Sequence, residues 1–179
     1  NQIELLLAYD ANPNRRLGDG KTPFHRAIER GGTLSFPFIL HSRTDLNKRL
    51  FNGDSPLHLA IKYNYAAIAC LLAVKGVDVT LRNCENRQSI EYISENVEPV
   101  LVESLILKGA YNRDLPYECR KALAFFSYKH NLLNACIYMC KRDLATFRLV
   151  IRNSKLNSNS LIIFLITEKK FDLALALIN

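Results

Sequence analysis

The chain has 179 residues, of which 49% are hydrophobic and 23% charged, and this composition is that of an ordinary folded protein, not of a disordered one. Its formal net charge of +7 permits contact with acidic surfaces, but the 24 Lys and Arg residues are scattered along the chain and form no basic arm of the kind that binds nucleic acid. No apolar run approaches the ~18 residues of a membrane-spanning helix, and five Cys residues without framework spacing favour reduced thiols in the cytosol.

Two segments of the N-terminal half repeat one pattern 33 positions apart. The segment GKTPFHRAIERG begins at Gly20, and GDSPLHLAIKYN begins at Gly53. Other rows of residues keep the same step, such as Leu6, Ile39, Leu72 and Leu105. A fixed period in this range is typical of stacked repeat proteins, in which a residue that recurs in each copy usually serves the repeat itself.

Each copy carries the local signals of a helix that begins after a turn. Gly20 or Gly53 can take a positive φ and turn the chain, and Thr22 or Ser55 then caps the helix. Pro follows at the first helical position, where its missing N–H costs nothing. A second helix comes next in each repeat, AAIACLLAV in one and VESLILKG in another.

These segments resemble the ankyrin-repeat family. TPFHRA (residues 22–27) and SPLHLA (residues 55–60) look like the family signature T-P-L-H-x-A, and the 33-residue period is the same. IELLLAYDANPN is similar to the family's second helix and the connector that follows it. The resemblance implies a mostly α solenoid of helix–turn–helix units with short β-hairpin fingers, closed by degenerate helix pairs.

The pattern weakens in the third copy, NRQSIEYISEN. Asn86 replaces the glycine but still tolerates the left-handed conformation, and Glu91 replaces the histidine. A fourth copy, from Cys119, keeps only the apolar helix pattern. We therefore expect ankyrin repeats over residues 1–130, the first one partial.

Residues 131–179 are expected to hold degenerate helical repeats that continue the same stack. From residue 134 the 33-residue step fails, and an approximate step of 27 replaces it, which indicates helix pairs that have lost the hairpin finger. The expected helices lie near 132–141, 143–153, 159–168 and 170–178.

His25 and His58 invite a catalytic interpretation, because each follows a Thr or Ser by three positions. In ankyrin repeats this histidine is structural and forms hydrogen bonds between neighbouring repeats. Its recurrence at the 33-residue step favours that role, since a catalytic site needs one constellation and not one per repeat. No Asp or Glu recurs to orient either imidazole. The sequence thus predicts two scaffold histidines, no catalytic residue and no enzyme.

Cys136 and Cys140 lie four residues apart on one predicted helical face. A zinc site would need two further ligands, and the nearby Cys119 and His130 match neither a zinc-finger spacing nor a cysteine-protease motif. No phosphate loop, dinucleotide fingerprint or HExxH motif occurs. We expect Cys136 and Cys140 to be buried apolar side chains, with no metal, no cofactor and no small-molecule substrate.

The resemblance implies a protein–protein interaction module that binds its partner through the hairpin tips and the concave face. Carrying the family pattern along the 33-residue step predicts a partner-binding set of exposed residues: Lys21, Glu29, Arg30, Asn52, Asp54, Lys62, Tyr63, Glu85, Arg87, Glu95, Arg120, Tyr128 and Lys129. Tyr and Arg are preferred in binding hot spots. The alternative at each single position is a solvated side chain.

A second hypothesis makes the array the targeting or scaffold part of a larger multidomain effector or enzyme whose catalytic domain lies outside this chain. The composition is similar to that of ankyrin proteins injected by intracellular bacteria and of viral ankyrin proteins, and a eukaryotic adaptor fits the motifs equally. The expected location is the cytoplasm, or the host-cell cytosol for a secreted effector. A third hypothesis, binding of acidic ligands or nucleic acid, would give steep salt dependence.

Overall fold

Short helices joined by tight turns make up most of the chain. The computed structural model describes residues 2–31, 35–94, 96–153, 162, 165–166 and 170–178. The chain divides into two units, residues 1–101 and residues 102–179. Each unit is described by itself below.

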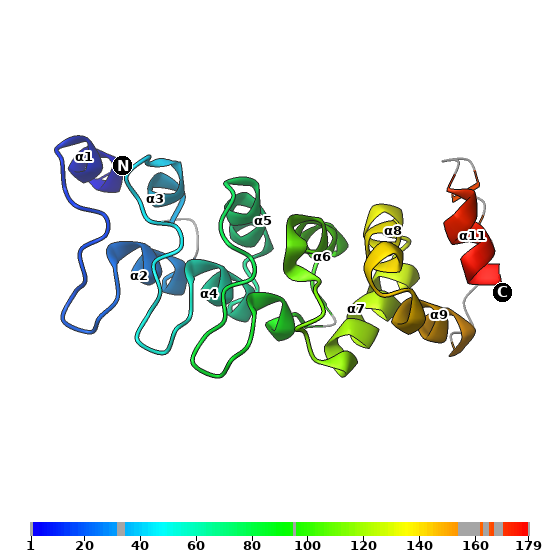
Figure 1. The fold of residues 1–179 in the computed structure, drawn as a ribbon. Coiled ribbons are helices and arrows are strands. Elements are labelled where there is room, and N and C mark those ends of the chain that lie inside the picture. The colour runs from blue at the N-terminus through cyan, green and yellow to red at the C-terminus, as the bar shows by residue number, and fades with distance from the viewer. Residues whose placement is uncertain are drawn as a thin grey trace. The chain divides into compact units, whose positions relative to one another are not determined.

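The helices of the first unit form two rows (Figure 1). One row consists of α2 (Pro23–Glu29), α4 (Pro56–Lys62) and the 3-10 helix η2 (Ser89–Tyr92). The other row consists of α1 (Gln2–Ala8), α3 (Phe36–Leu40) and α5 (Ala66–Val74). Helix α4 packs against α2, α5 and η2, and α3 packs against α5. The predicted stack of helix–turn–helix units is therefore confirmed for this unit.

One apolar residue per repeat fills the core of the first row. Phe24, Leu57 and Ile90 stand 33 positions apart, and each is only 1% exposed. Fully burying a side chain of this size contributes about 1.5–3 kcal/mol relative to leaving it exposed. The 33-residue step therefore places the same contact between each repeat and the next.

The first helices begin where the sequence predicts. The hydroxyl groups of Thr22 and Ser55 each accept the backbone N–H of the residue three positions on, at 3.4 Å, and Pro occupies the first helical turn. Gly20 and Gly53 have φ values of 77° and 78°. A Cβ at Gly53 would lie 2.7 Å from the backbone nitrogen of Cys84, so a larger residue does not fit there.

His25 and His58 are fully buried and join successive repeats. Nδ1 of His25 accepts the backbone N–H of Thr22 at 3.3 Å, and Nε2–H donates to the carbonyl oxygen of Lys48 in the next repeat at 2.8 Å. His58 repeats this arrangement with the cap of its own helix and with the carbonyl oxygen of Arg87, at 3.1 Å. The hydrogen bonds predicted between neighbouring repeats are confirmed.

The third repeat keeps the side-chain cap of its helix but lacks the hydrogen bond from that side chain to the next repeat. Oε1 of Glu91, at the histidine position, accepts the backbone N–H of Gln88 at 2.8 Å. Asn86 takes the glycine position with a φ of 60°, as predicted. A carboxylate has no proton to donate to a further carbonyl. The side chain that joins the earlier repeats therefore has no counterpart at this position.

The described secondary-structure elements of the second unit are all helices or helical turns. Its elements are α6 (Pro99–Leu105), which begins in the first unit, a wide turn η3 (Ile106–Ala110), α7 (Tyr117–Lys129), α8 (Leu133–Arg142), α9 (Leu144–Asn153) and α11 (Phe171–Ile178). Helix α7 packs against α8 and α9, and α8 packs against η3. The helices predicted near 132–141, 143–153 and 170–178 are confirmed, and most of the predicted helix at 159–168 lies outside the described residues.

Cys136 and Cys140 belong to the core of the second unit, beside Met139 and Phe147. They are 1% and 3% exposed, so the predicted burial is confirmed. Burial raises the pKa of the Cys136 thiol well above its ordinary value and that of Cys140 to about 12, which keeps both thiols neutral.

Neither a membrane span nor a metal cluster is found within the described residues. No helix there is both long and apolar enough to cross a bilayer. No three His, Cys, Asp or Glu side chains of that part of the chain gather around a point where a metal ion would fit. The five Cys side chains, all described, form no disulfide.

Replacing His58 with Ala tests the link between repeats. The substitution removes one of the two donors to the carbonyl oxygen of Arg87 and leaves the N–H of Ser55 without its acceptor, and a buried group left unsatisfied costs about 1–3 kcal/mol. We expect the free energy of unfolding, measured by urea titration with circular dichroism, to fall by at least that amount. Glu91→Ala is the matched control and should cost less, because it removes a cap without a link; an equal loss in both variants would contradict the inference.

Lower pH should destabilise the first unit through the same histidines. Burial lowers the pKa of His25 and His58 below their ordinary value of 6.5, so both stay neutral in the fold. Their contribution to stability is present above pH 6.5 and is lost as the pH falls below it, because the unfolded chain then binds protons that the folded chain does not. The slope is at most about 1.4 kcal/mol per pH unit for each histidine.

The measurement is the urea midpoint at pH 7.5, 6.5 and 5.5. His58→Gln should flatten the pH dependence, because it removes one of the two buried imidazoles whose pKa is lowered. An equal slope in the wild type and the variant would mean that His58 is not its source.

Candidate functional site

Three loops of the first unit, one before each first helix, have the same backbone geometry (Figure 1). We call them finger 1 (residues 16–21), finger 2 (residues 49–54) and finger 3 (residues 82–87). Each is closed by one hydrogen bond four residues apart: Leu17 N–H to the Lys21 carbonyl at 2.8 Å, Leu50 N–H to the Asp54 carbonyl at 2.8 Å, and Asn83 N–H to the Arg87 carbonyl at 3.0 Å. Within the described residues, a β bridge forms only in finger 3, so the predicted hairpins are very short.

A row of arginines fixes the fingers to one another. Arg16 donates to the carbonyl oxygen of Gly20 in its own finger at 2.5 Å and to that of Arg49 in the next finger at 2.7 Å. Arg49 donates to Gly53 at 3.1 Å and to the carbonyl oxygen of Arg82. Arg16, Arg49 and Arg82 are not in the predicted set, although they stand 33 positions apart and this step is the sequence signal that identifies them.

An ion pair lies at the base of each of the first two fingers, and its polarity is reversed between them. Nζ of Lys21 lies 2.6 Å from Oε1 of Glu29, and Nζ of Lys62 lies 2.7 Å from Oδ2 of Asp54. Positions 21 and 54 are equivalent, as are positions 29 and 62. All four residues belong to the predicted partner-binding set, but each forms an ion pair with another residue of its own repeat.

The prediction that Asp54 is exposed is wrong, since the residue is only 2% exposed. Its carboxylate accepts hydrogen bonds from Lys62, from Nδ2 of Asn83 at 2.8 Å and from Nδ2 of Asn52 at 2.9 Å. Burial opposes ionisation, but the bonds from Lys62 and Asn83 outweigh it and hold the pKa of the Asp54 carboxyl below its ordinary value. Asp54 is therefore a buried anion that orders finger 2.

The space between fingers 1 and 2 and helices α2 and α4 is a hollow of about 480 Å³, which we call the finger hollow. Its lining includes these members of the predicted set: Lys21, Glu29, Asn52, Asp54, Lys62 and Tyr63. Asp19, Leu50, Phe51 and Leu59 complete it and were not predicted. The structure thus brings together the predicted residues of the first two repeats, with the exception of Arg30.

Two large aromatic side chains are exposed at the finger hollow. Phe51 is 76% exposed and Tyr63 is 46% exposed. The Phe51 ring lies against Gly20, and the guanidinium of Arg16 is 5.3 Å from its centroid. The Tyr63 ring stacks on Tyr65 at a centroid distance of 6.0 Å. The signal for Phe51 in the sequence is an aromatic residue next to the turn of an otherwise polar finger.

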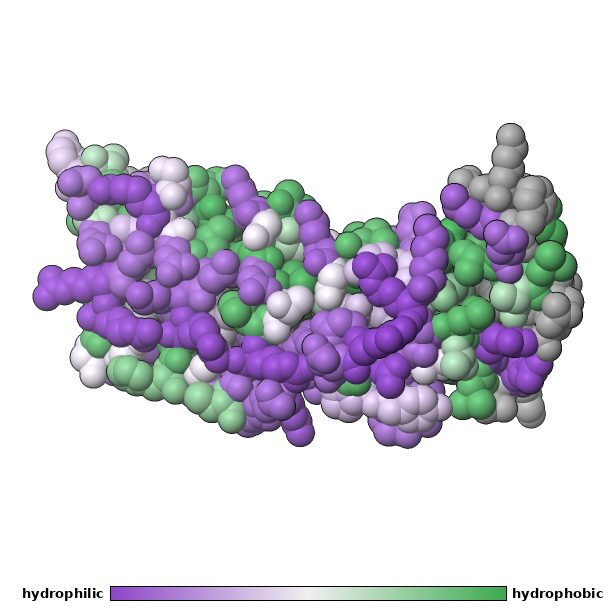
Figure 2. Space-filling view, in the orientation of Figure 1, coloured by the Kyte–Doolittle hydropathy of each residue, from purple (hydrophilic) through white to green (hydrophobic). Residues whose placement is uncertain are grey.

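On the face shown in Figure 2, hydrophilic residues cover most of the first unit. Around Phe51, the lining of the finger hollow includes the charged side chains of Asp19, Lys21, Glu29, Asp54 and Lys62. Apolar side chains framed by polar ones are the usual composition of a protein-binding patch.

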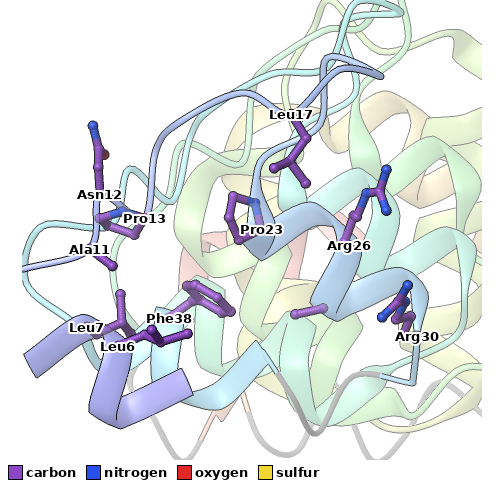
Figure 3. A pocket seen from close by; sticks show the side chains of 11 residues that line it. Leu6, Leu7, Ala11, Asn12, Pro13, Leu17, Pro23, Arg26, Arg30 and Phe38 are labelled. Carbon is purple, nitrogen blue, oxygen red and sulfur yellow. The ribbon is translucent and has the colours of Figure 1, made fainter. Parts of the chain in front are cut away.

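Arg30 does not belong to the finger hollow. It lines a second hollow of about 300 Å³, in which Leu6, Leu7 and Phe38 gather on one side and Arg26 on the other (Figure 3). Leu6 is 61% exposed, whereas Ile39, the equivalent residue of the next repeat, is 2% exposed. The second hollow therefore exposes a surface of the first repeat whose equivalent in the second repeat is buried.

The remaining residues of the predicted set lie apart from the finger hollow. Arg87 is exposed on finger 3, with its guanidinium 5.7 Å from the ring of Tyr92 and 4.0 Å from Glu85. Glu95 lies outside the described residues. In the third repeat, Arg87 and Glu95 occupy the two positions that form the ion pairs of the first and second repeats, and their charges are opposite.

Three members of the set belong to the second unit. Arg120 forms an ion pair with Asp143 and is partly buried. Lys129 is exposed, as predicted. The predicted exposure of Tyr128 is wrong, because the residue is only 9% exposed. It lies on the face of α7 that also buries Ala124, against the neighbouring helices α8 and α9.

The comparison with known families agrees with this architecture. The family model for ankyrin repeats, with three copies, matches residues 1–83, which include fingers 1 and 2 and helices α1 to α5. Residues 1–83 therefore match the ankyrin-repeat family. Ankyrin repeats generally mediate protein–protein interaction, and the family is typically non-catalytic.

Several known proteins are similar to part of the chain. An ankyrin repeat protein of fowlpox virus is 29% identical over 84 residues, which are 46% of this chain and 20% of the viral protein. The human transient receptor potential cation channel subfamily A member 1 is 29% identical over 92 residues, 51% of this chain and 8% of the channel. The Xenopus laevis neurogenic locus notch homolog protein 1 is 27% identical over 111 residues, 62% of this chain and 4% of that protein. The chain thus spans a fifth or less of the length of these relatives.

The reversed ion pairs predict that charge can be exchanged in the first repeat. Lys21→Asp alone should destabilise the protein, because two carboxylates would then face each other. Adding Glu29→Lys recreates the order found at Asp54 and Lys62 and should restore most of the loss. A double-mutant cycle by urea unfolding should give a coupling of about 0.5–1 kcal/mol, as for partly exposed pairs. A double variant no more stable than Lys21→Asp would show that the pair contributes nothing.

Proposed function

We propose that this protein binds a partner protein at the finger hollow, with Phe51 and Tyr63 as the anchoring side chains. The observation that carries the proposal is the exposure of both rings at one concavity of about 480 Å³. Aromatic anchors in a hollow with a polar rim are the usual composition of a binding hot spot. Lys21, Glu29, Asn52 and Lys62 supply the polar rim.

Fixed fingers support the proposal. The arginine row ties finger 1 to finger 2 and finger 2 to finger 3 through hydrogen bonds to backbone carbonyl groups. Asp54 ties finger 2 to Asn83 of finger 3. A surface that is ordered before binding loses little conformational entropy when the partner docks.

The charges at the finger hollow favour a protein over a nucleic acid. Its lining contains the carboxylates of Asp19, Glu29 and Asp54 and the ammonium groups of Lys21 and Lys62. A phosphate backbone would require an excess of cations there. A partner with one or more apolar side chains and mixed charges around them fits the surface better.

The test is affinity capture with matched variants of the full chain. Phe51→Ala with Tyr63→Ala removes the proposed anchors, and Tyr9→Ala with Phe36→Ala removes two exposed aromatic residues of the same unit outside the finger hollow. A partner captured by the wild type should bind at least about thirtyfold more weakly to the first variant, equivalent to about 2 kcal/mol, and unchanged to the second. Circular dichroism must show that both variants are folded. A partner lost from the second variant and kept by the first would place the interface elsewhere.

We further propose that the array is the recognition part of a longer protein that works in a reducing compartment such as the cytosol. The three relatives described above are each much longer than the matched region. Five Cys side chains without a disulfide support the reducing compartment. The full-length gene tests the first point, and localisation of a tagged full-length protein tests the second.

A further inference from the structure

The second unit contains a hollow of about 350 Å³ with a mainly cationic lining, which we call the basic hollow. Arg113 comes from the loop before α7, Arg120 from α7, and Lys141 and Arg142 from the last turn of α8. Asp143 is the acidic residue of the lining. Residues far apart in the sequence thus bring four cations and one carboxylate to one concavity.

The carboxylate of Asp143 is already used. It forms an ion pair with Arg120, accepts the hydroxyl of Tyr111 at 3.4 Å, and accepts the backbone N–H of Thr146 at 3.3 Å. Burial opposes its ionisation, but the contacts with Thr146 and Arg120 prevail and hold the pKa of the Asp143 carboxyl below its ordinary value. Asp143 and Arg120 therefore neutralise each other.

The other three cations of the basic hollow have no carboxylate partner within the part of the chain that the structure describes. Among the described residues, no Asp or Glu lies within ion-pair distance of Arg113, Lys141 or Arg142. Nε of Arg120 is also buried and has no hydrogen-bond partner in that part of the chain. Buried donors of this kind usually meet a bound ion or an ordered water.

Charge at a helix end explains part of this arrangement. Lys141 and Arg142 lie in the last turn of α8, where cations are favourable, and the guanidinium of Arg142 lies 3.8 Å from the centroid of the Tyr138 ring. Neither effect accounts for Arg113, which comes from a different segment to the same hollow.

The excess of positive charge extends over the whole second unit, because residues 102–179 hold 12 of the 24 Lys and Arg but only six of the 17 Asp and Glu.

We propose that the basic hollow binds a phosphate monoester group. Arg113, Lys141 and Arg142 carry three positive charges, more than one bound carboxylate would neutralise. A phosphate monoester carries a charge near −2 and has three acceptor oxygens, so it matches these cations better. The planar guanidinium of an arginine matches two of those oxygens at once. The same chemistry is offered by a phosphorylated side chain and by free phosphate. This proposal concerns the second unit and does not rest on the finger hollow.

The experiment is an NMR titration of the full chain labelled with ¹⁵N, at pH 7.5 and constant ionic strength. One arm uses inorganic phosphate, and the other uses a short phosphoserine peptide with its glutamate counterpart as reference. We expect saturable shifts of the amide signals of residues 111–114 and 141–143 in at least one arm. Arg113→Gln with Lys141→Gln should weaken that binding at least tenfold.

The matched control is Lys108→Gln with Lys129→Gln, which removes the same charge at exposed positions outside the basic hollow and should keep the wild-type affinity. Arg113→Gln alone, in an exposed loop, keeps the test valid if the double variant fails to fold. Tighter binding of the peptide indicates a protein-borne phosphate, and tighter binding of inorganic phosphate indicates a free one. The proposal is overturned if neither arm saturates, if the glutamate peptide binds equally, or if both double variants lose affinity alike.

Discussion

The bond from a buried imidazole to the main chain of the next repeat is the interaction on which the first unit depends. His25 and His58 cap their own helices through Nδ1 and reach the next repeat through Nε2–H, at the residue before finger 2 for His25 and in finger 3 for His58. One side chain thus couples the start of a helix to the position of a neighbouring loop. The finger hollow exists because the fingers are held in this way, with the arginine row as a second set of ties.

The recurrence of a residue at 33 positions identified most of the scaffold. The caps, the turns at Gly20 and Gly53 and the role of His58 follow from local rules, because each depends on residues within a few positions of one another. The burial of Asp54 and Tyr128 did not follow. Whether a polar side chain on a first helix or finger meets solvent depends on partners from another repeat or helix, as with Asn83 for Asp54, and such partners are not adjacent in sequence.

The sequence predicted which region of the repeats is exposed, but not which side chains there are paired and which are free to bind. The 33-residue step predicted that Lys62 and Tyr63 are exposed, and both are exposed and line the finger hollow. It did not reveal that Lys62 is paired with Asp54, and it passed over Phe51, which has no aromatic counterpart in the other fingers. A search for recurrence finds what repeats share, whereas recognition depends on what one repeat has alone. The predicted boundary near residue 130 stays a prediction.

The bonds of the histidine and arginine rows end on carbonyl oxygens of the main chain, at Lys48 and Arg87 for one row and at Arg49 and Arg82 for the other. Every amino acid supplies that acceptor, so the neighbour's side chain is irrelevant to these joints. The Lys21–Glu29 and Lys62–Asp54 pairs, in turn, close inside a single repeat, whereas Asn83 joins Asp54 of the preceding repeat through its side chain. The joints that end on the main chain tolerate any neighbour, so evolution can duplicate, delete or reorder such repeats by adjusting only the few side-chain contacts between them, and can vary the exposed surface of each one separately.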